Sequence, residues 1–183
     1  MIPPVIIGEP VVSRILLVGQ APGIREGELQ RPFAWTAGKT LFKWFATIGV
    51  DEAHFRRQVY MTAVCRCFPG KNPKGGDRVP NKVEIANCAQ WLNAEVEMLQ
   101  PELIIPVGKL AISQYMTVDR LVDVIGQAFA QPVNGVATTI IPLPHPSGAS
   151  TWHQRPPGKP LLQQALNLIE AQPAWRAMLD AGA

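Results

Sequence analysis

A histidine held between two prolines is the residue of this sequence best suited to do chemistry. His145 lies in the segment LPHPSGAS, where Pro144 and Pro146 restrict its backbone. An imidazole fixed in this way can stabilise charge on a leaving group or act as an acid. Ser147 and the N–H groups after Pro146 can bind a phosphate. The alternative is a structural histidine that bonds to a loop carbonyl.

The stretch GQAPG, residues 19–23, is the second feature that indicates a site. It follows the apolar run Ile15–Val18, which is the pattern of a strand covered on both faces. Gly19 and Gly23 can take backbone angles closed to other residues, and Pro22 fixes φ. The pattern therefore predicts a rigid turn that exposes its backbone, with a plain strand-to-helix loop as the alternative.

The elements that must position these residues follow an alternating pattern. Three further apolar segments also end in glycine or proline: residues 58–64, 103–107 and 137–143. Apolar residues at helical spacing predict helices over residues 39–47, 82–99, 109–116 and 161–169. Strands that alternate with helices favour a parallel sheet covered on both faces. We therefore expect an α/β fold, a single-domain three-layer α/β/α sandwich with a central, mostly parallel four-stranded sheet.

The carboxyl ends of parallel strands share one edge, and ligands bind in the crevice there. The loops GQAPG, CRCFPG, PVGK and PHPSG should then meet in one cleft. Gly108 and Lys109 begin a helix whose free N–H groups can bind a phosphate. The loops together carry about +8 of charge, which suits a surface that faces phosphates, although solvated loops often collect basic residues. The basic residues expected to contact DNA are Lys71, Lys74, Arg78, Lys109 and Arg155.

Composition places the chain among globular proteins. Its 183 residues are 47% hydrophobic and 17% charged, which fits one domain over residues 1–183. No apolar run approaches the roughly 20 residues that cross a bilayer, so we expect no membrane association. The first ten residues do not resemble a signal peptide, which favours a cytoplasmic protein, and we expect a monomer. The three cysteines are an odd number without a C-x-x-C pair, which argues against a disulfide framework.

The motifs GQAPG, RPF followed by AG, and HPSG resemble, in this order and spacing, the uracil-DNA glycosylase superfamily. The middle pair comprises Arg31–Phe33 and Ala37–Gly38. The resemblance runs from about Leu16 to Ile169 and points to the thermostable iron-sulfur branch, whose first motif is of the GEAPG type. It implies a cleft that takes a uracil flipped out of DNA, whose N-glycosidic bond is then cut by water.

The resemblance also implies roles for individual residues. Phe33 would stack on the base, and His145 would stabilise the negative charge that develops at O2 of the leaving uracil. Backbone N–H groups from Gln20 and Ala21 onward would hold the base. Ser147 and its neighbours would grip a flanking phosphate.

The first motif departs from the family pattern at two positions. The iron-sulfur branch has Glu where this chain has Gln20, and the best-known uracil-DNA glycosylases have Asp where it has Ala21. Neither residue ionises, so the carboxylate that usually positions water is missing from its usual place. Glu26 is the best substitute, Gln20 itself can orient water, and Asp77 is a remoter candidate.

Two later segments also differ from the family. Thr62 and Ala63 follow the second strand where the family has the Asn that hydrogen-bonds the uracil edge, so the choice of base is left open. The segment after HPSG usually provides a wedge that fills the gap left by the flipped base. Here Trp152 or Arg155 would have to do so.

The cysteines do not match the iron-sulfur branch, which ligates its cluster with four of them, two ahead of the first motif. This chain has none there. Cys88 and either Cys65 or Cys67 resemble remnants of that set. We therefore expect no cluster, no other metal and no cofactor.

These observations favour a DNA N-glycosylase, a hydrolase that flips uracil or a related deaminated base out of DNA and releases it in base excision repair. The partner would be DNA containing uracil or another damaged base. The alternative is a catalytically weak or silent module that binds uracil-containing or abasic DNA. A third possibility is an enzyme for another base or for a free nucleoside, although the basic loops favour a polymer.

Overall fold

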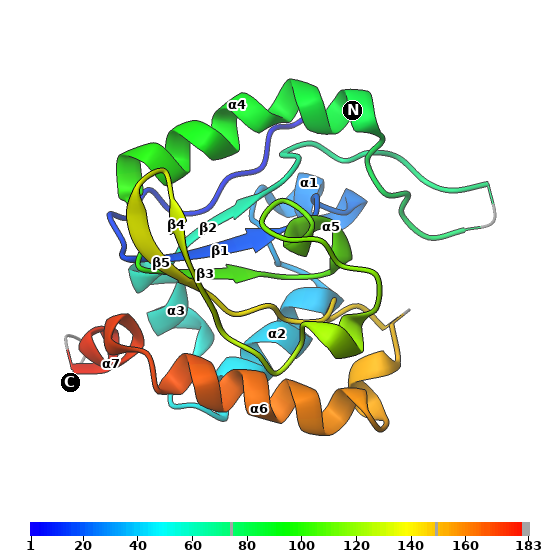
Figure 1. Cartoon of the computed structure of the whole chain (residues 1–183). Helices are drawn as coiled ribbons and strands as arrows, with labels where there is room; N and C mark the ends of the chain where they lie inside the picture. Colours follow the sequence, from blue (N-terminus) through cyan, green and yellow to red (C-terminus); the bar gives the residue numbers. More distant parts are fainter. Residues whose placement is uncertain (74, 149, 181–183) are drawn as a thin grey trace.

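The structure, a computed structural model, describes residues 1–73, 75–148 and 150–180. A five-stranded sheet lies at its centre, in the order β2-β1-β3-β5-β4 (Figure 1). Four of its strands run parallel to one another: β1 (Ile15–Gly19), β2 (Tyr60–Ala63), β3 (Leu103–Pro106) and β5 (Val136–Ile140). The expected α/β fold with a mostly parallel sheet is confirmed.

The prediction of four strands is wrong, because β4 (Phe129–Val133) adds a fifth that pairs antiparallel with β5. Asn134 and Gly135 join the two strands, with φ of 49° and 80°. Positive φ at both central residues is the geometry of the type I′ hairpin turn that Asn-Gly favours. Pro132 is tolerated because β4 lies at the edge of the sheet.

Helices surround the sheet. They are α1 (Ile24–Leu29), α2 (Thr36–Ala46), α3 (Glu52–Gln58), α4 (Lys82–Leu99), α5 (Lys109–Ile112), α6 (Gly158–Glu170) and α7 (Pro173–Asp180). The predicted bounds of α4 are confirmed, and Asn81 and Glu84 form a capping box at its start. The helix predicted over residues 109–116 is too long, because α5 ends at Ile112.

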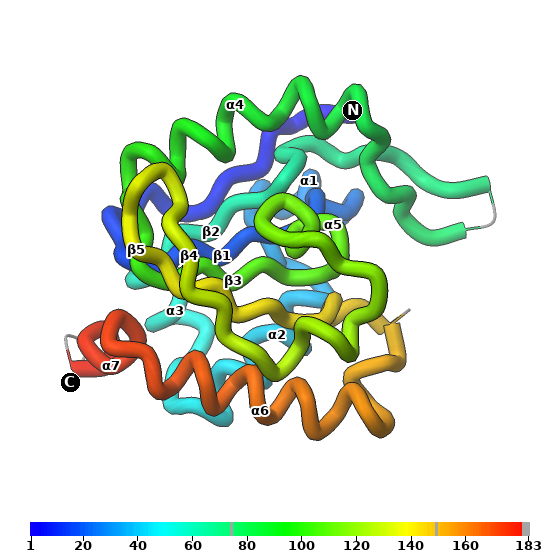
Figure 2. Tube along the Cα trace, in the orientation of Figure 1, coloured from blue at the N-terminus to red at the C-terminus, as the bar shows by residue number. Residues whose placement is uncertain are grey.

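Residues of the central strands alternate between two hydrophobic cores. Ile15 and Leu17 pack into a core with side chains of α2, α3, α6 and α7, whereas Leu16 and Val18 pack into a core with α4 and α5. Figure 2 shows the same layers, with α4 on one side of the sheet and α2 and α6 on the other. Burial on both faces is why β1 has a continuous apolar run instead of an alternating one.

Within the described residues, every helix is too short or too polar to span a membrane.

Candidate active site

The loops after β1, β2, β3 and β5 meet at one edge of the sheet, as expected for parallel strands. The chain continues past β5 in the same direction, since Val107 and Leu143 form a parallel bridge. The Gly-Pro loop after β1 and the histidine loop after β5 are therefore neighbours of Gly108, although they are far apart in the sequence.

His145 packs directly on Gly108. A Cβ atom built on Gly108 would lie 2.9 Å from His145 Cδ2, so only glycine leaves room for the ring. The backbone N–H of Ser147 donates to His145 Nδ1 over 3.3 Å. Because Nδ1 accepts this bond, the proton of the neutral ring lies on Nε2. Burial lowers the pKa of His145, and nearby His153 lowers it further, so the ring is neutral at pH 7.

The ring of Phe33 lies against the end of β1. A Cβ on Gly19 would meet Phe33 Cε2 and Cζ at 3.1 Å, which leaves no space for a side chain there. Phe33 is half-buried and contacts the edge of the core formed with α2 and α3. The aromatic face expected to stack on a base is therefore fixed beside the GQAPG loop.

Gln20 and Ala21 are the first two residues of that loop after the end of β1. The carbonyl of Gln20 accepts the backbone N–H of Cys65 over 3.1 Å, which ties the loop to the segment after β2. Ala21 packs against the core beneath α4. Both residues are half-buried, so part of each remains accessible.

The two substitute carboxylates lie together at Gly23. Glu26 is 9% exposed, and its Oε2 accepts the Gly23 N–H over 3.0 Å. A Cβ on Gly23 would lie 2.8 Å from Asp77 Oδ2 and 2.9 Å from Glu26 Oε2, so both carboxylates crowd the same side of the loop. Burial raises the pKa of Glu26, and the charge of Asp77 adds to this rise. Asp77, expected to be the remoter candidate, is exposed and lies beside Glu26 at Gly23.

The side chain of Thr62, which is expected to help bind the base, is buried and already has a hydrogen-bond partner within the chain. Its hydroxyl donates to Glu95 Oε2 over 2.7 Å, and Tyr60 donates to Oε1 of the same carboxylate over 2.7 Å. Arg66 completes the cluster at 2.5 Å from Glu95. Side chains alternate along a strand, so Ala63 faces the opposite side from Thr62. No motif near Thr62 indicates Glu95, because that residue lies 33 positions further along the chain, on α4.

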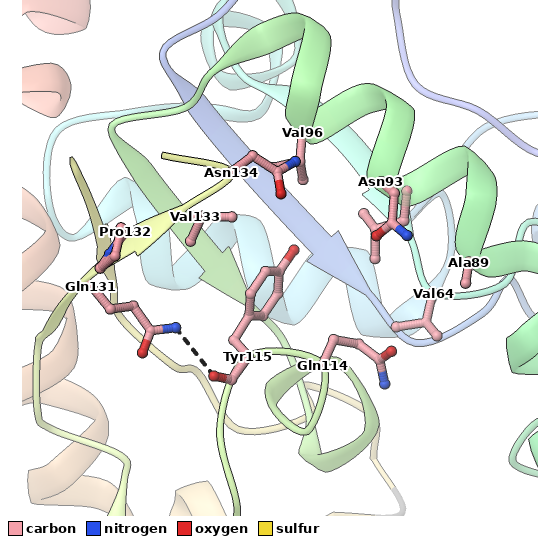
Figure 3. Close-up of a pocket in the computed structure, with 11 residues that line it drawn as sticks. Val64, Ala89, Asn93, Val96, Gln114, Tyr115, Gln131, Pro132, Val133 and Asn134 are labelled. Carbon is pink, nitrogen blue, oxygen red and sulfur yellow. Dashed lines mark hydrogen bonds between the residues drawn. The ribbon is translucent and has the colours of Figure 1, made fainter. Parts of the chain in front are cut away.

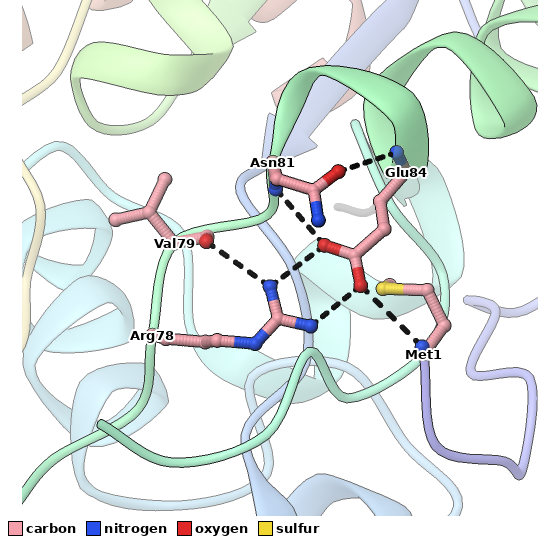
Figure 4. Close-up of polar contacts among 5 residues, drawn as sticks. All are labelled: Met1, Arg78, Val79, Asn81 and Glu84. Atoms are coloured by element: carbon pink, nitrogen blue, oxygen red, sulfur yellow. Dashed lines mark hydrogen bonds and ion pairs between the residues drawn. The ribbon is translucent and has the colours of Figure 1, made fainter. Parts of the chain in front are cut away.

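Arg78, which is expected to contact DNA, forms an ion pair within the chain. Its guanidinium makes two bonds to Glu84, at 2.7 and 2.5 Å, and the amino terminus of Met1 lies 3.4 Å from the same carboxylate (Figure 4). Arg78 holds the pKa of Glu84 at about 2, with help from the Asn81 N–H. Lys71 is exposed in the same loop, and Lys74 lies outside the described residues.

The polar groups of Gly108 and Lys109 that are expected to bind a phosphate also have hydrogen-bond partners within the chain. The Gly108 N–H donates to the Leu143 carbonyl over 2.9 Å, so it is not available to a phosphate. Lys109 Nζ donates to the Asp119 carbonyl over 2.8 Å.

The two wedge candidates differ in exposure. Trp152 is half-buried and packs against the core, with its backbone pressed against Gly158, whereas Arg155 is exposed. Of the two, Arg155 is the side chain that can reach outward.

The cysteines lie close together, but they do not fit an iron-sulfur cluster. Cys65 and Cys67 both lie near Cys88. Burial and the proximity of Cys88 raise the pKa of Cys65 to about 12, which keeps it a thiol. Such clusters are held by four thiolates, and the chain has three cysteines. Across residues 1–73, 75–148 and 150–180, no group of His, Cys, Asp or Glu is arranged to hold a metal.

A cavity of about 310 Å³ lies elsewhere, on the α4 face of the sheet. Its wall includes Asn93, Tyr115 and Asn134, and the Tyr115 side chain points into it (Figure 3). None of the predicted site residues lines this cavity. Its position separates it from the edge where His145 and Phe33 lie.

Comparison with known proteins places the chain in a family. The family model described as the uracil DNA glycosylase superfamily matches residues 6–170. A type-4 uracil-DNA glycosylase of Pyrobaculum aerophilum is 30% identical over 73% of this chain, and one of Thermotoga maritima is 32% identical over 78%. A third, from Archaeoglobus fulgidus, is 29% identical over 74%.

The aligned region spans 66%, 70% and 66% of those three relatives, or about two thirds of each. The family model covers most of the present chain, including both the GQAPG loop and His145. The chain therefore belongs to the uracil-DNA glycosylase superfamily.

Proposed function

We propose that this protein is a DNA glycosylase that takes uracil, or a related deaminated base, out of DNA and hydrolyses its N-glycosidic bond. The observation that carries the proposal is the fixed, neutral imidazole of His145. It is seated on Gly108, with the Ser147 N–H on Nδ1 and the ring proton therefore on Nε2. Family membership and the names of the relatives support the same activity.

In this mechanism the bond between the base nitrogen and C1′ of the sugar breaks first. Its electron pair leaves with the base, and His145 Nε2–H stabilises the negative charge that develops on a base oxygen. Phe33 stacks on the flipped base and offsets part of the cost of flipping. Backbone groups at Gln20 and Ala21, with Ala63, line the base pocket.

Water then adds to C1′ and loses a proton to a carboxylate. Asp77 is the better proton acceptor of the two that meet at Gly23, because it is exposed. Glu26 is buried and already accepts the Gly23 N–H, so it holds the conformation of the loop. Gln20 can orient the same water through its amide.

DNA would cross the loops around this edge. Lys71 and Arg155 are exposed cations suited to phosphate contacts, and Lys74 belongs to the same loop as Lys71. The Ser147 N–H is occupied by His145, so Ser147 would bind a flanking phosphate through its hydroxyl. Arg155 would fill the gap left by the flipped base.

The second candidate is a module that binds uracil-containing or abasic DNA with little turnover. It is favoured by two observations, the uncharged Gln20-Ala21 pair in the first motif and the Thr62 hydroxyl bonded to Glu95. One experiment separates the two candidates. Oligonucleotides with uracil, hypoxanthine or an abasic site are incubated with excess protein, and both binding and base release are measured at several salt concentrations.

Release of a base above the rate in protein-free controls establishes the glycosylase. Salt-sensitive binding without release, for every base tested, establishes the binding module instead. Asp77→Asn and Glu26→Gln then identify the proton acceptor, since loss of the residue that accepts the proton of water should slow net hydrolysis more than loss of the other, once folding is shown to be intact.

A further inference from the structure

The turn that carries Phe33, residues 31–35, has a conformation that must be held in place. Phe33 has a φ of 51°, in the left-handed region that residues with a side chain rarely adopt. Such a backbone costs free energy and persists only where its surroundings enforce it. The sequence of the turn supplies no glycine at this position, so the restraint must come from outside.

Two glycines leave space for the turn without holding it. A Cβ on Gly38 would lie 1.7 Å from the Phe33 carbonyl oxygen, and one on Gly19 would touch the Phe33 ring at 3.1 Å. These contacts limit how far the turn can move toward α2 and β1. These contacts with the two glycines do not attach the turn on its opposite side.

Arg56 of α3 supplies that attachment. Its Nη1 donates to the Pro32 carbonyl over 2.9 Å and its Nη2 to the Phe33 carbonyl over 3.1 Å. Nε donates to Glu52 over 2.8 Å, and the guanidinium lies 4.6 Å from the Phe42 ring centroid. One planar group therefore binds two consecutive carbonyls of the turn while Glu52 and the Phe42 ring hold the guanidinium itself in place.

Packing alone does not explain an arginine at this position. Arg56 is 4% exposed, and burial of a charge costs free energy. Burial accordingly lowers the pKa of the guanidinium. An apolar side chain would fill the space at a lower cost in free energy, but only the forked donors of a guanidinium match two adjacent carbonyls. A cavity of about 240 Å³ beside Pro32 and Arg56 gives the turn room to move once these hydrogen bonds are lost.

We infer that Arg56 is a positioning residue, which holds the Phe33 ring in the plane where it stacks on a flipped base. The inference rests on the proposed function and names a determinant of base binding that does not itself touch DNA. It places control of the cleft in α3, outside the three sequence motifs.

The test compares Arg56→Met with Arg57→Gln. Methionine fills much of the same volume without donors, and Arg57 is the adjacent, exposed arginine of the same helix. Hydrogen exchange of backbone amides is measured first. Arg56→Met should speed exchange in a peptide covering residues 31–38 while the peptides of β1 and β3 keep the wild-type rate, and Arg57→Gln should change neither.

Base release from uracil-containing single strands is measured next, under single-turnover conditions. Arg56→Met should slow release by about tenfold or more, because small displacements of positioning groups have effects of this size. In a Phe33→Leu background the same change should cost less than about threefold, since the group it positions is already gone. If Arg56 only stabilised the fold, Arg56→Met would slow base release by the same factor in the wild-type and the Phe33→Leu backgrounds.

Gly38→Ala tests the turn from its other side and keeps the inference testable if Arg56→Met folds poorly. Its methyl group would displace the Phe33 carbonyl, so the same local exchange and the same loss of release are expected. Unchanged exchange at residues 31–38 in both variants would overturn the inference. Wild-type protein that releases no base would instead refute the proposed function, and the exchange data would still decide whether Arg56 holds the turn.

Discussion

Replacement of Gly108 by alanine should damage catalysis through His145 without removing any catalytic group. The new Cβ would lie 2.9 Å from His145 Cδ2 and 3.3 Å from its Cβ, where ordinary contacts begin at 3.4 Å. The imidazole must therefore shift by about 0.5 Å or more, and a displacement near 1 Å can cost about 10²-fold in rate. We expect base release to slow by between about tenfold and 10²-fold.

The same substitution also strains the backbone, because Gly108 has a φ of 87°. A non-glycine residue there should lower the free energy of unfolding by about 1–3 kcal/mol. For a chain of this size the midpoint of thermal unfolding would fall by roughly 2–10 °C. Loss of stability alone must therefore be separated from loss of the histidine geometry.

Gly135→Ala provides that separation. Gly135 also has a positive φ, of 80°, but a Cβ there meets nothing within 4 Å. Both variants are assayed for uracil release in single turnover, at a temperature where circular dichroism shows them folded. Gly135→Ala should be less stable yet release base at the wild-type rate. If Gly108→Ala releases base as fast as Gly135→Ala, the assigned position of the His145 ring is wrong.

Three further predictions concern the surroundings of the site. Thr62→Val removes a hydrogen bond to Glu95 and should lower the free energy of unfolding, measured by urea titration, by about 1 kcal/mol. The rate of base release should stay unchanged, and slower release would indicate that Thr62 does contact the base. The pKa values of His145 and His153 are lowered in the fold, so the unfolded chain binds more protons below about pH 6.5. The free energy of unfolding should fall as pH drops from 7 to 5. The double variant with both histidines changed to Gln should lose less of it than wild type does. An equal loss in the two proteins would contradict the lowered pKa values of His145 and His153. Freshly purified protein should show no absorbance near 400 nm and no bound iron, and a brown, iron-loaded preparation would contradict the conclusion that the three cysteines do not fit a cluster.

Local patterns were enough to predict most of the framework. The apolar run at Ile15–Val18 and the helical spacing over residues 82–99 both depend on neighbouring residues, and both predictions hold in the structure. The fifth strand was missed because Phe129–Val133 alternates weakly and contains a proline, although Asn134-Gly135 after it is a strong hairpin signal.

The features of the site that the sequence did not reveal depend on contacts between residues that are not neighbours in the chain. Nothing near Thr62 shows that its hydroxyl bonds to Glu95, and nothing near Arg78 shows that Glu84 neutralises it. The approach of Asp77 to Glu26 likewise depends on how two separate loops fold over Gly23. Motif spacing therefore indicated which loops to consider, whereas the hydrogen-bond partners of their polar groups required the structure.

The most direct test of the central claim is single-turnover release of uracil from matched oligonucleotides by wild-type protein and by His145→Ala. The substrates carry uracil in a single strand, opposite G and opposite A. Removal of a group that stabilises developing charge usually costs about 3–4 kcal/mol, so the variant should release uracil about 10²- to 10³-fold more slowly, with DNA binding retained. Equal rates for the two proteins would contradict the role of His145 and the mechanism built on it.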